Sequence, residues 1–155
     1  MGITSAICST FKKELMTATH NFTTTSGNTM KVALIKAQAS QTGTYSAATT
    51  SYTTITGNSD ELANGSGYTT GGNSLTNVTP TNGTSTTTTA LTDFADSSWT
   101  SATFTTRGCV IYNDTASGDP AVMVIDFGAD YSVAGGTFTI QFPTADASNA
   151  ILRLA

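Results

Sequence analysis

The chain has 155 residues and a formal net charge of −4, and only 10% of its residues are charged, against roughly 25% in ordinary soluble domains. Its six basic residues are scattered rather than clustered, which argues against direct binding to nucleic acid, and no stretch approaches the roughly 20 apolar residues that a membrane span needs. Its length predicts a single domain over residues 1–155.

The first stretch predicts an amphipathic helix over residues 3–18. Apolar residues recur there almost every four positions, at Ile3, Ile7, Phe11, Leu15 and Ala18, and so form one stripe of a helix. A helix of this length is marginal alone in water, so the stripe must face either its own sheet or a neighbouring subunit. In the second case Ile7, Phe11 and Leu15 are the candidate interface residues.

Strands are expected along the next part of the chain. Apolar residues alternate in 29–36, which predicts a strand with one face better buried than the other. A weak strand is expected at 52–55, one turn of helix at 60–62, and a further strand at 74–78. The threonine run at 84–89 predicts an exposed extended strand, because β-branched residues are stiff and favour extended backbone.

The strongest strand patterns lie between residues 99 and 128. The aliphatic run 122–125 is typical of a strand buried on both faces, and 109–112 is its natural antiparallel partner across the turn formers of 113–120. A second turn is expected at 129–136, then an alternating strand at 137–142 and a last strand within 149–154. About eight short strands predict an all-β, mainly antiparallel domain, β-sandwich or jelly-roll-like, with an added N-terminal helix.

No pattern indicates a catalytic, cofactor-binding or metal site, and we expect no enzymatic activity. His20, the one histidine, stands where the helix should end, so a capping or surface role is favoured over catalysis. A zinc site would need it together with Cys8, Cys109 and carboxylates at no recognisable spacing. These two cysteines are expected to be free buried thiols, although a disulfide between them stays open.

Six aspartates lie in or beside predicted turns, where turn formation is the simplest explanation for them: Asp93, Asp96, Asp114, Asp119, Asp126 and Asp130. Calcium is the one metal that such oxygen donors suit, for example at Asp114 and Asp119, but no EF-hand spacing supports it. The glycines at 65–72 lack the Gly-Lys-Ser/Thr sequence of a phosphate loop.

Several sequence segments, spread along nearly the whole chain, are similar to those of a known protein family. They are ITSAICSTFKKELMTATHNF, GNTMKVALIKA, GSGYTTGGNSL, DFADSSWTSATFTTRGCVIYN, AVMVIDFG and GGTFTIQFPTADASNAILRLA, in that order. With them the chain resembles a family of small virion structural proteins of tailed bacteriophages. The resemblance implies a β-rich particle component and supplies no catalytic residues.

From the resemblance and the composition we expect a capsid decoration, or cement, protein. It would bind the outer shell and bridge subunits of the major capsid protein, after synthesis in the cytoplasm of the bacterial host. Self-association as a trimer or dimer is expected to match the local symmetry of the shell.

Two alternatives stay open. The first is a tail, neck or fibre-attachment component of the same particle. The second is a module that binds host-surface carbohydrate, which would need exposed aromatic residues such as Tyr45, Tyr52, Tyr68 or Trp99 along a shallow groove.

Overall fold

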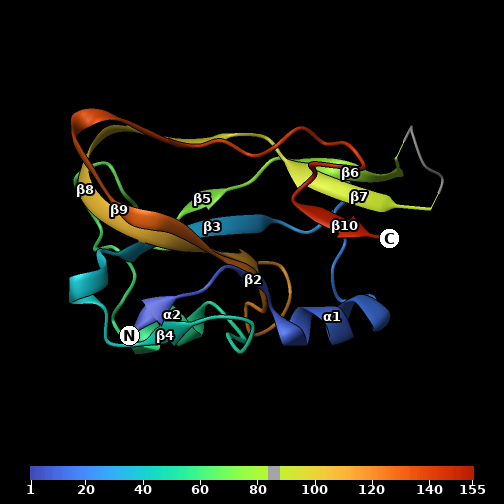
Figure 1. Ribbon diagram of the computed structural model, residues 1–155, viewed down its shortest axis with the longest axis horizontal. Helices are drawn as coiled ribbons and strands as arrows, with labels where there is room; N and C mark the ends of the chain where they lie inside the picture. Colours follow the sequence, from blue (N-terminus) through green and yellow to red (C-terminus); the bar gives the residue numbers. More distant parts are fainter. Residues whose placement is uncertain (84–87) are drawn as a thin grey trace.

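The computed structural model describes residues 1–83 and 88–155, and most of them lie in strands (Figure 1). Strands hold 47% of the residues and helices 11%, and the sheets are mainly antiparallel, so the predicted all-β class with a short N-terminal helix is confirmed. Most of the strand predicted at 84–89 lies outside the described residues. The elements are β1 Gly2–Ile3, β2 Ala6–Ile7, α1 Ser9–Met16, β3 Met30–Lys36, η1 Gln38–Ser40, β4 Thr44–Tyr45, α2 Thr53–Gly57, β5 Asn73–Ser74, β6 Asn77–Asn82, β7 Ala90–Phe94, β8 Ser97–Asn113, β9 Ala121–Ile140 and β10 Leu152–Leu154.

One long antiparallel hairpin, made of β8 and β9, organises the fold. Its register pairs Cys109 with Ile125, Val110 with Val124 and Ile111 with Met123, which confirms the predicted pairing of 109–112 with 122–125. The turn between the strands occupies 114–120, within the predicted turn. All of 121–124 is buried, as expected of a strand covered on both faces.

The hairpin bends sharply in its middle and folds back over itself (Figure 1). At the bend Thr106 pairs with Tyr131 and Gly108 with Asp126, so Arg107 alone stands opposite four residues of β9. Such a bulge bends a strand and increases its twist. The guanidinium of Arg107 donates from Nε to Oδ1 of Asp126 over 2.7 Å, which ties the two strands together at the bend.

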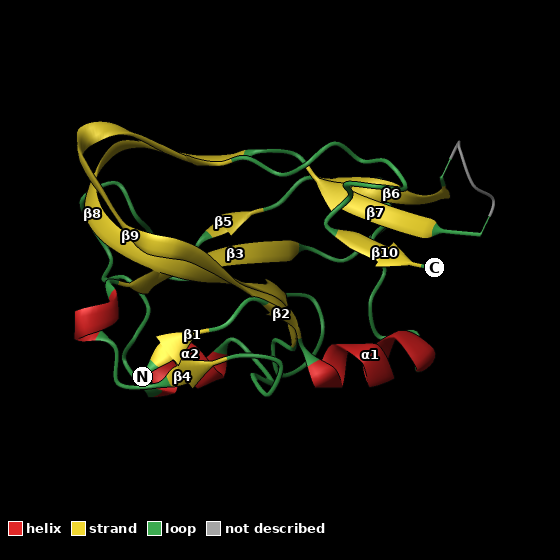
Figure 2. Ribbon diagram, viewed as in Figure 1, coloured by secondary structure: helices red, strands yellow, loops and turns green. Residues whose placement is uncertain are grey.

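The bend separates two β layers. The lower half of the hairpin joins a five-stranded sheet in the order β2-β9-β8-β3-β5, whereas β10-β7-β6 form a separate three-stranded sheet. Figure 2 shows α1 and α2 below the five-stranded sheet, and the three-stranded sheet at the right of the view, above α1. Aromatic rings meet between the arms of the hairpin, among them Phe104 and Phe138, whose ring centroids lie 5.6 Å apart. Such packing of large rings is a main source of hydrophobic stabilisation.

The predicted helix at 3–18 is wrong in its first half. Residues of β1 pair in parallel with β4, and Ala6 and Ile7 of β2 pair with Val124 and Met123, so α1 begins only at Ser9. A four-residue spacing places side chains on one face of a helix, but it also places them on one face of a strand, where side chains alternate. The pattern was therefore ambiguous, and pairing with strands distant in sequence decided it.

Three other local predictions are wrong. The segment expected as a weak strand at 52–55 forms most of α2. There the side chains of Thr56 and Asn58 donate hydrogen bonds to backbone carbonyl oxygens. Such local bonds from polar side chains compete with the backbone pairing of a strand. The helical turn expected at 60–62 is extended, and Glu61 bridges to Ile35. The turn expected at 129–136 is part of β9, whose Gly128 and Gly135 adopt positive φ within the strand.

Candidate functional site

An apolar groove lies between α1 and the three-stranded sheet, and we call it the α1 groove. Its volume is about 670 Å³, within the range of ordinary ligand pockets. Ile7, Phe11 and Leu15 line one wall, and Leu91, Leu152 and Leu154 line the other. A smaller cavity that contains Ile7, Ile151 and Arg153 continues beside β10.

The structure brings the three candidate interface residues together in this groove, but they differ in burial. Phe11 is only 2% exposed and belongs to the hydrophobic core. Its ring lies 4.9 Å from that of His20 and 6.1 Å from that of Phe22. Ile7 and Leu15 are partly buried against the same core. The helix thus anchors itself to its own chain through Phe11, and Ile7 and Leu15 keep accessible surface.

The groove is open to solvent and its rim is positively charged. Lys12 and Arg153 line it, and the described lining residues include no carboxylate. Of four large hydrophobic side chains that are strongly exposed, Leu154 (62% exposed) lines the groove and Met16 (82% exposed) ends the helix beside it. An open apolar surface of this kind often marks a binding site.

The groove borders an open sheet edge. β10 pairs with β7 through Leu152–Thr92, Arg153–Leu91 and Leu154–Ala90. Within the described chain, no strand pairs with the other side of β10. The outward backbone N–H and C=O groups of such an edge strand are available for hydrogen bonds to another strand.

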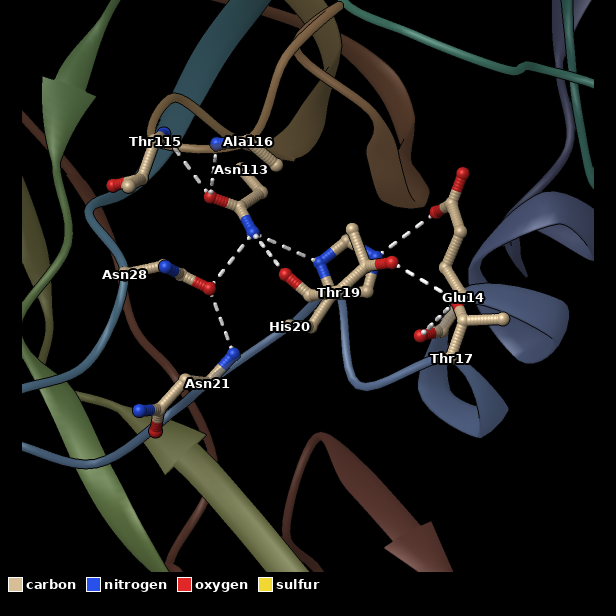
Figure 3. A network of polar contacts seen from close by, with 9 residues as sticks. All are labelled: Glu14, Thr17, Thr19, His20, Asn21, Asn28, Asn113, Thr115 and Ala116. Carbon is tan, nitrogen blue, oxygen red and sulfur yellow. Dashed lines mark hydrogen bonds and ion pairs between the residues drawn. The ribbon is translucent and has the colours of Figure 1, made fainter.

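A polar network fixes α1 to the central hairpin (Figure 3). The wholly buried side chain of His20 contacts Oε2 of Glu14 through Nε2, over 2.9 Å. Its Nδ1 lies 3.0 Å from Nδ2 of Asn113, the last residue of β8. The predicted capping or surface role of His20 is therefore wrong, because α1 ends at Met16 with Thr17 as its C-cap and the His20 side chain is wholly buried.

The partners of Asn113 define the proton positions in the network. Its Oδ1 accepts the backbone N–H groups of Thr115 and Ala116, and its amide nitrogen faces the oxygen Oδ1 of Asn28. The nitrogen therefore donates to Nδ1 of His20, and Nε2 carries the proton that is donated to Glu14. Both ring nitrogens are thus engaged, and the network supports the position of the helix that lines the groove.

The aspartates do not all lie in turns. Asp93, in β7, is almost fully buried; burial raises the pKa of its carboxyl, and the N–H groups of Phe94 and Ile151 donate to it. Asp126 lies within β9 and pairs with an arginine, as described above. Of the pair considered for calcium, Asp114 forms an ion pair with Lys31 at 3.1 Å. Across 1–83 and 88–155, no three histidine, cysteine or acidic side chains gather in a metal-binding arrangement.

The two cysteines are free and buried, as expected. Burial raises the pKa of the Cys8 thiol to about 12, with a further contribution from the negative charge of Glu14. Burial also raises the pKa of Cys109. Raised values keep both groups as thiols, whereas the thiolate is the reactive form.

The aromatic residues suggested for carbohydrate binding are mostly buried, so that suggestion is wrong for three of its four residues. Tyr45, Tyr68 and Trp99 are each at most 3% exposed. Tyr68 and the half-buried Tyr52 donate their hydroxyls to the carboxylate of Glu61, over 2.7 and 2.6 Å. These rings serve the core and its polar network rather than a groove open to sugars.

Sequence patterns indicate only one wall of the α1 groove. Its far wall comes from β7 and β10, and nothing in the pattern of 90–94 or 152–154 indicates that these strands face the first helix.

In the described chain, no helix is long and apolar enough to cross a lipid bilayer. Comparison with models of known protein families, with curated proteins and with solved structures finds no match to this chain.

Proposed function

We propose that this protein is a structural component of a tailed-bacteriophage particle, and specifically a decoration protein of its capsid. It binds the outside of the assembled shell and bridges neighbouring subunits of the major capsid protein. The resemblance of its sequence phrases to small virion proteins supports the family, and the low content of charged residues suits a surface that packs against many identical neighbours.

The observation that carries the proposal is the α1 groove. It is apolar and open, and its accessible hydrophobic surface includes the side chains of Ile7, Leu15 and Leu154. Stable bridging needs interfaces of roughly 1,000 Å² or more, so the groove forms the centre of a larger contact. Self-association as a trimer or dimer multiplies weak contacts through avidity and matches the local symmetry of a shell.

A rebinding experiment tests the proposal. Particles of the phage that encodes the chain are stripped of this protein and mixed with the purified protein, and co-sedimentation measures binding. We expect saturable binding to intact shells and no binding to isolated tails. Binding to tails alone would contradict the proposal and favour the tail, neck or fibre-attachment alternative.

A matched pair of variants locates the contact. Leu154→Asp places a charge in the groove, whereas Tyr131→Asp changes another exposed hydrophobic side chain, 51% exposed, which does not line this groove. We expect at least a tenfold loss of shell binding for Leu154→Asp and little change for Tyr131→Asp. Equal binding by both variants would remove the α1 groove from the contact.

A further inference from the structure

We propose that the α1 groove binds an extended, apolar segment that carries at least one carboxylate, and that this segment adds to β10 as a fourth strand. The inference rests on the proposed function for the identity of the partner, a segment of the major capsid protein. The chemistry of the segment rests on the groove alone.

The first argument is the open edge of β10. This strand pairs with β7 on one side only. Its Leu152, Arg153 and Leu154 line the groove, and Figure 1 shows β10 between β7 and α1. An extended peptide laid along this edge gains backbone hydrogen bonds, and its alternate side chains point to one face. Those side chains meet Phe11 and Leu15 across the groove.

The second argument is charge. The chain carries a net charge of −4, yet the described charged residues that line the groove are Lys12 and Arg153, both exposed. The ion pairs that Lys31 and Arg107 form in the described chain lie elsewhere, with Asp114 and Asp126. The groove therefore favours a partner with negative charge, because complementary charge speeds encounter and excludes partners of the wrong sign.

The contacts of Arg153 leave its guanidinium able to bind a carboxylate of the partner. Its Nη1 donates to the carbonyl oxygens of Ala147 and Ser148. The positive charge of Arg153 also acts on Asp146 and helps to lower the pKa of that carboxyl, but hydrogen bonds from Asn149 and Ser148 come first among the causes. Asp146 thus has its own partners, and the backbone bonds hold Arg153 beside the groove.

The open edge of β10 distinguishes a peptide from a lipid. A fatty acid would satisfy the cationic rim and the apolar walls, but it has no groups to pair with the edge of β10. An extended peptide satisfies the rim, the walls and the edge together. We therefore assign the groove to a peptide.

The test uses the neighbouring lysines of α1 as a matched pair. Lys12 lines the groove and Lys13 does not, although both are exposed. The purified chain is used to select from a displayed library of random 12-residue peptides, and the enriched peptides are measured against wild type, Lys12→Glu, Lys13→Glu and Arg153→Glu. Thermal unfolding checks that each variant folds.

We expect enriched peptides with alternating apolar residues and at least one Asp or Glu. Their affinity should fall at least tenfold for Lys12→Glu and Arg153→Glu and less than twofold for Lys13→Glu. Hydrogen exchange at the amides of 152–154 should slow when the peptide binds. Enriched peptides without carboxylates, or equal effects of Lys12→Glu and Lys13→Glu, would overturn the inference.

Two further outcomes separate this inference from the proposed function. If the peptides behave as expected but the wild-type chain binds no shell, the proposed function fails and the strand-binding groove remains. If the wild-type chain binds shells and both lysine variants bind them equally, the decoration function remains and the groove chemistry is overturned. Occupation of the groove by dodecanoate, with no peptide enriched and no protection of β10, would also overturn it.

Discussion

Lys12, in the first helix, and Arg153, in the last strand, line the same groove. Their proximity follows from the folded hairpin, which carries the three-stranded sheet back toward the N-terminal segment (Figure 1). The groove is therefore a product of the whole topology. Changes that loosen either wall should alter it even where they do not touch its surface.

Phe11 should contribute to folding far more than Leu154 does, although both line the groove. Phe11→Ala removes a ring that is 2% exposed, and we expect the free energy of unfolding to fall by about 3–5 kcal/mol. Leu154→Ala changes a side chain that is 62% exposed, so the change should stay within about 0.5 kcal/mol. Urea unfolding of both variants measures the difference, and similar losses would contradict the position of α1.

The polar network around His20 gives a second prediction. Asn113→Leu removes the donor to Nδ1 of His20 and the acceptor for the N–H groups of Thr115 and Ala116. The ring nitrogen of the buried His20 side chain is left without a partner, which costs about 1–3 kcal/mol. The loss of the two bonds that Oδ1 accepts adds to this cost, so we expect a fall of about 2–4 kcal/mol in the free energy of unfolding.

The control for this network is Thr139→Val, which removes an exposed hydroxyl paired with Ser98 and should change stability by less than about 0.5 kcal/mol. Denaturant unfolding of both variants decides the matter. A neutral Asn113→Leu would show that the network does not hold α1 to the hairpin.

Gly72 and Gly118 offer a test of close backbone packing. Both have positive φ, but a Cβ at Gly72 would lie 1.8 Å from the carbonyl oxygen of Val32, whereas nothing lies within 4 Å of one at Gly118. Gly118→Ala should cost about 1 kcal/mol from backbone strain alone. Gly72→Ala should cost several times more or prevent folding, as thermal unfolding and soluble yield would reveal. Equal costs would contradict the packing of this loop against β3.

Asp60 should make the free energy of unfolding depend on pH in the acid range. Burial alone would raise the pKa of its carboxyl, but hydrogen bonds from Tyr45, Gly43 and Thr42 hold that pKa below its usual value. A lowered folded-state pKa stabilises the fold fully above the unfolded value of about 3.9, and this stabilisation is lost as the pH falls toward the folded value.

The comparison for Asp60 is Asp60→Asn, which keeps the shape but cannot ionise. We expect it to be less stable than wild type at pH 7 and to lose less of its remaining stability between about pH 4 and pH 2. Urea unfolding across this range measures both slopes. Parallel pH profiles would show that Asp60 does not contribute to the acid sensitivity.

The hairpin was predictable and the groove was not, for physical reasons. Turn residues at 113–120 and aliphatic runs on both sides act locally, so the register of 109–112 with 122–125 followed from the sequence. The start of α1 did not, because the spacing of Ile3, Ile7 and Phe11 suits a strand face as well as a helix face. Gly135 lies in the segment 129–136, whose pattern predicts a turn, but its positive φ instead shapes a bulge that depends on the opposite strand.

Of the candidate site, only the wall formed by Ile7, Phe11 and Leu15 was within reach of sequence patterns. The opposite wall depends on β10 pairing with β7, a contact between segments far apart in the chain. The burial of His20 is not predictable from local sequence for a similar reason. Its burial follows from Asn113, whose position near the helix is set by the hairpin.

The proposal that this chain decorates a bacteriophage capsid is tested most directly by its copy number in purified particles. Quantitative mass spectrometry gives the ratio of this protein to the major capsid protein. We expect a fixed simple fraction, on the order of hundreds of copies in each particle, because a decoration protein follows the symmetry of the shell. A handful of copies, or none, would contradict it.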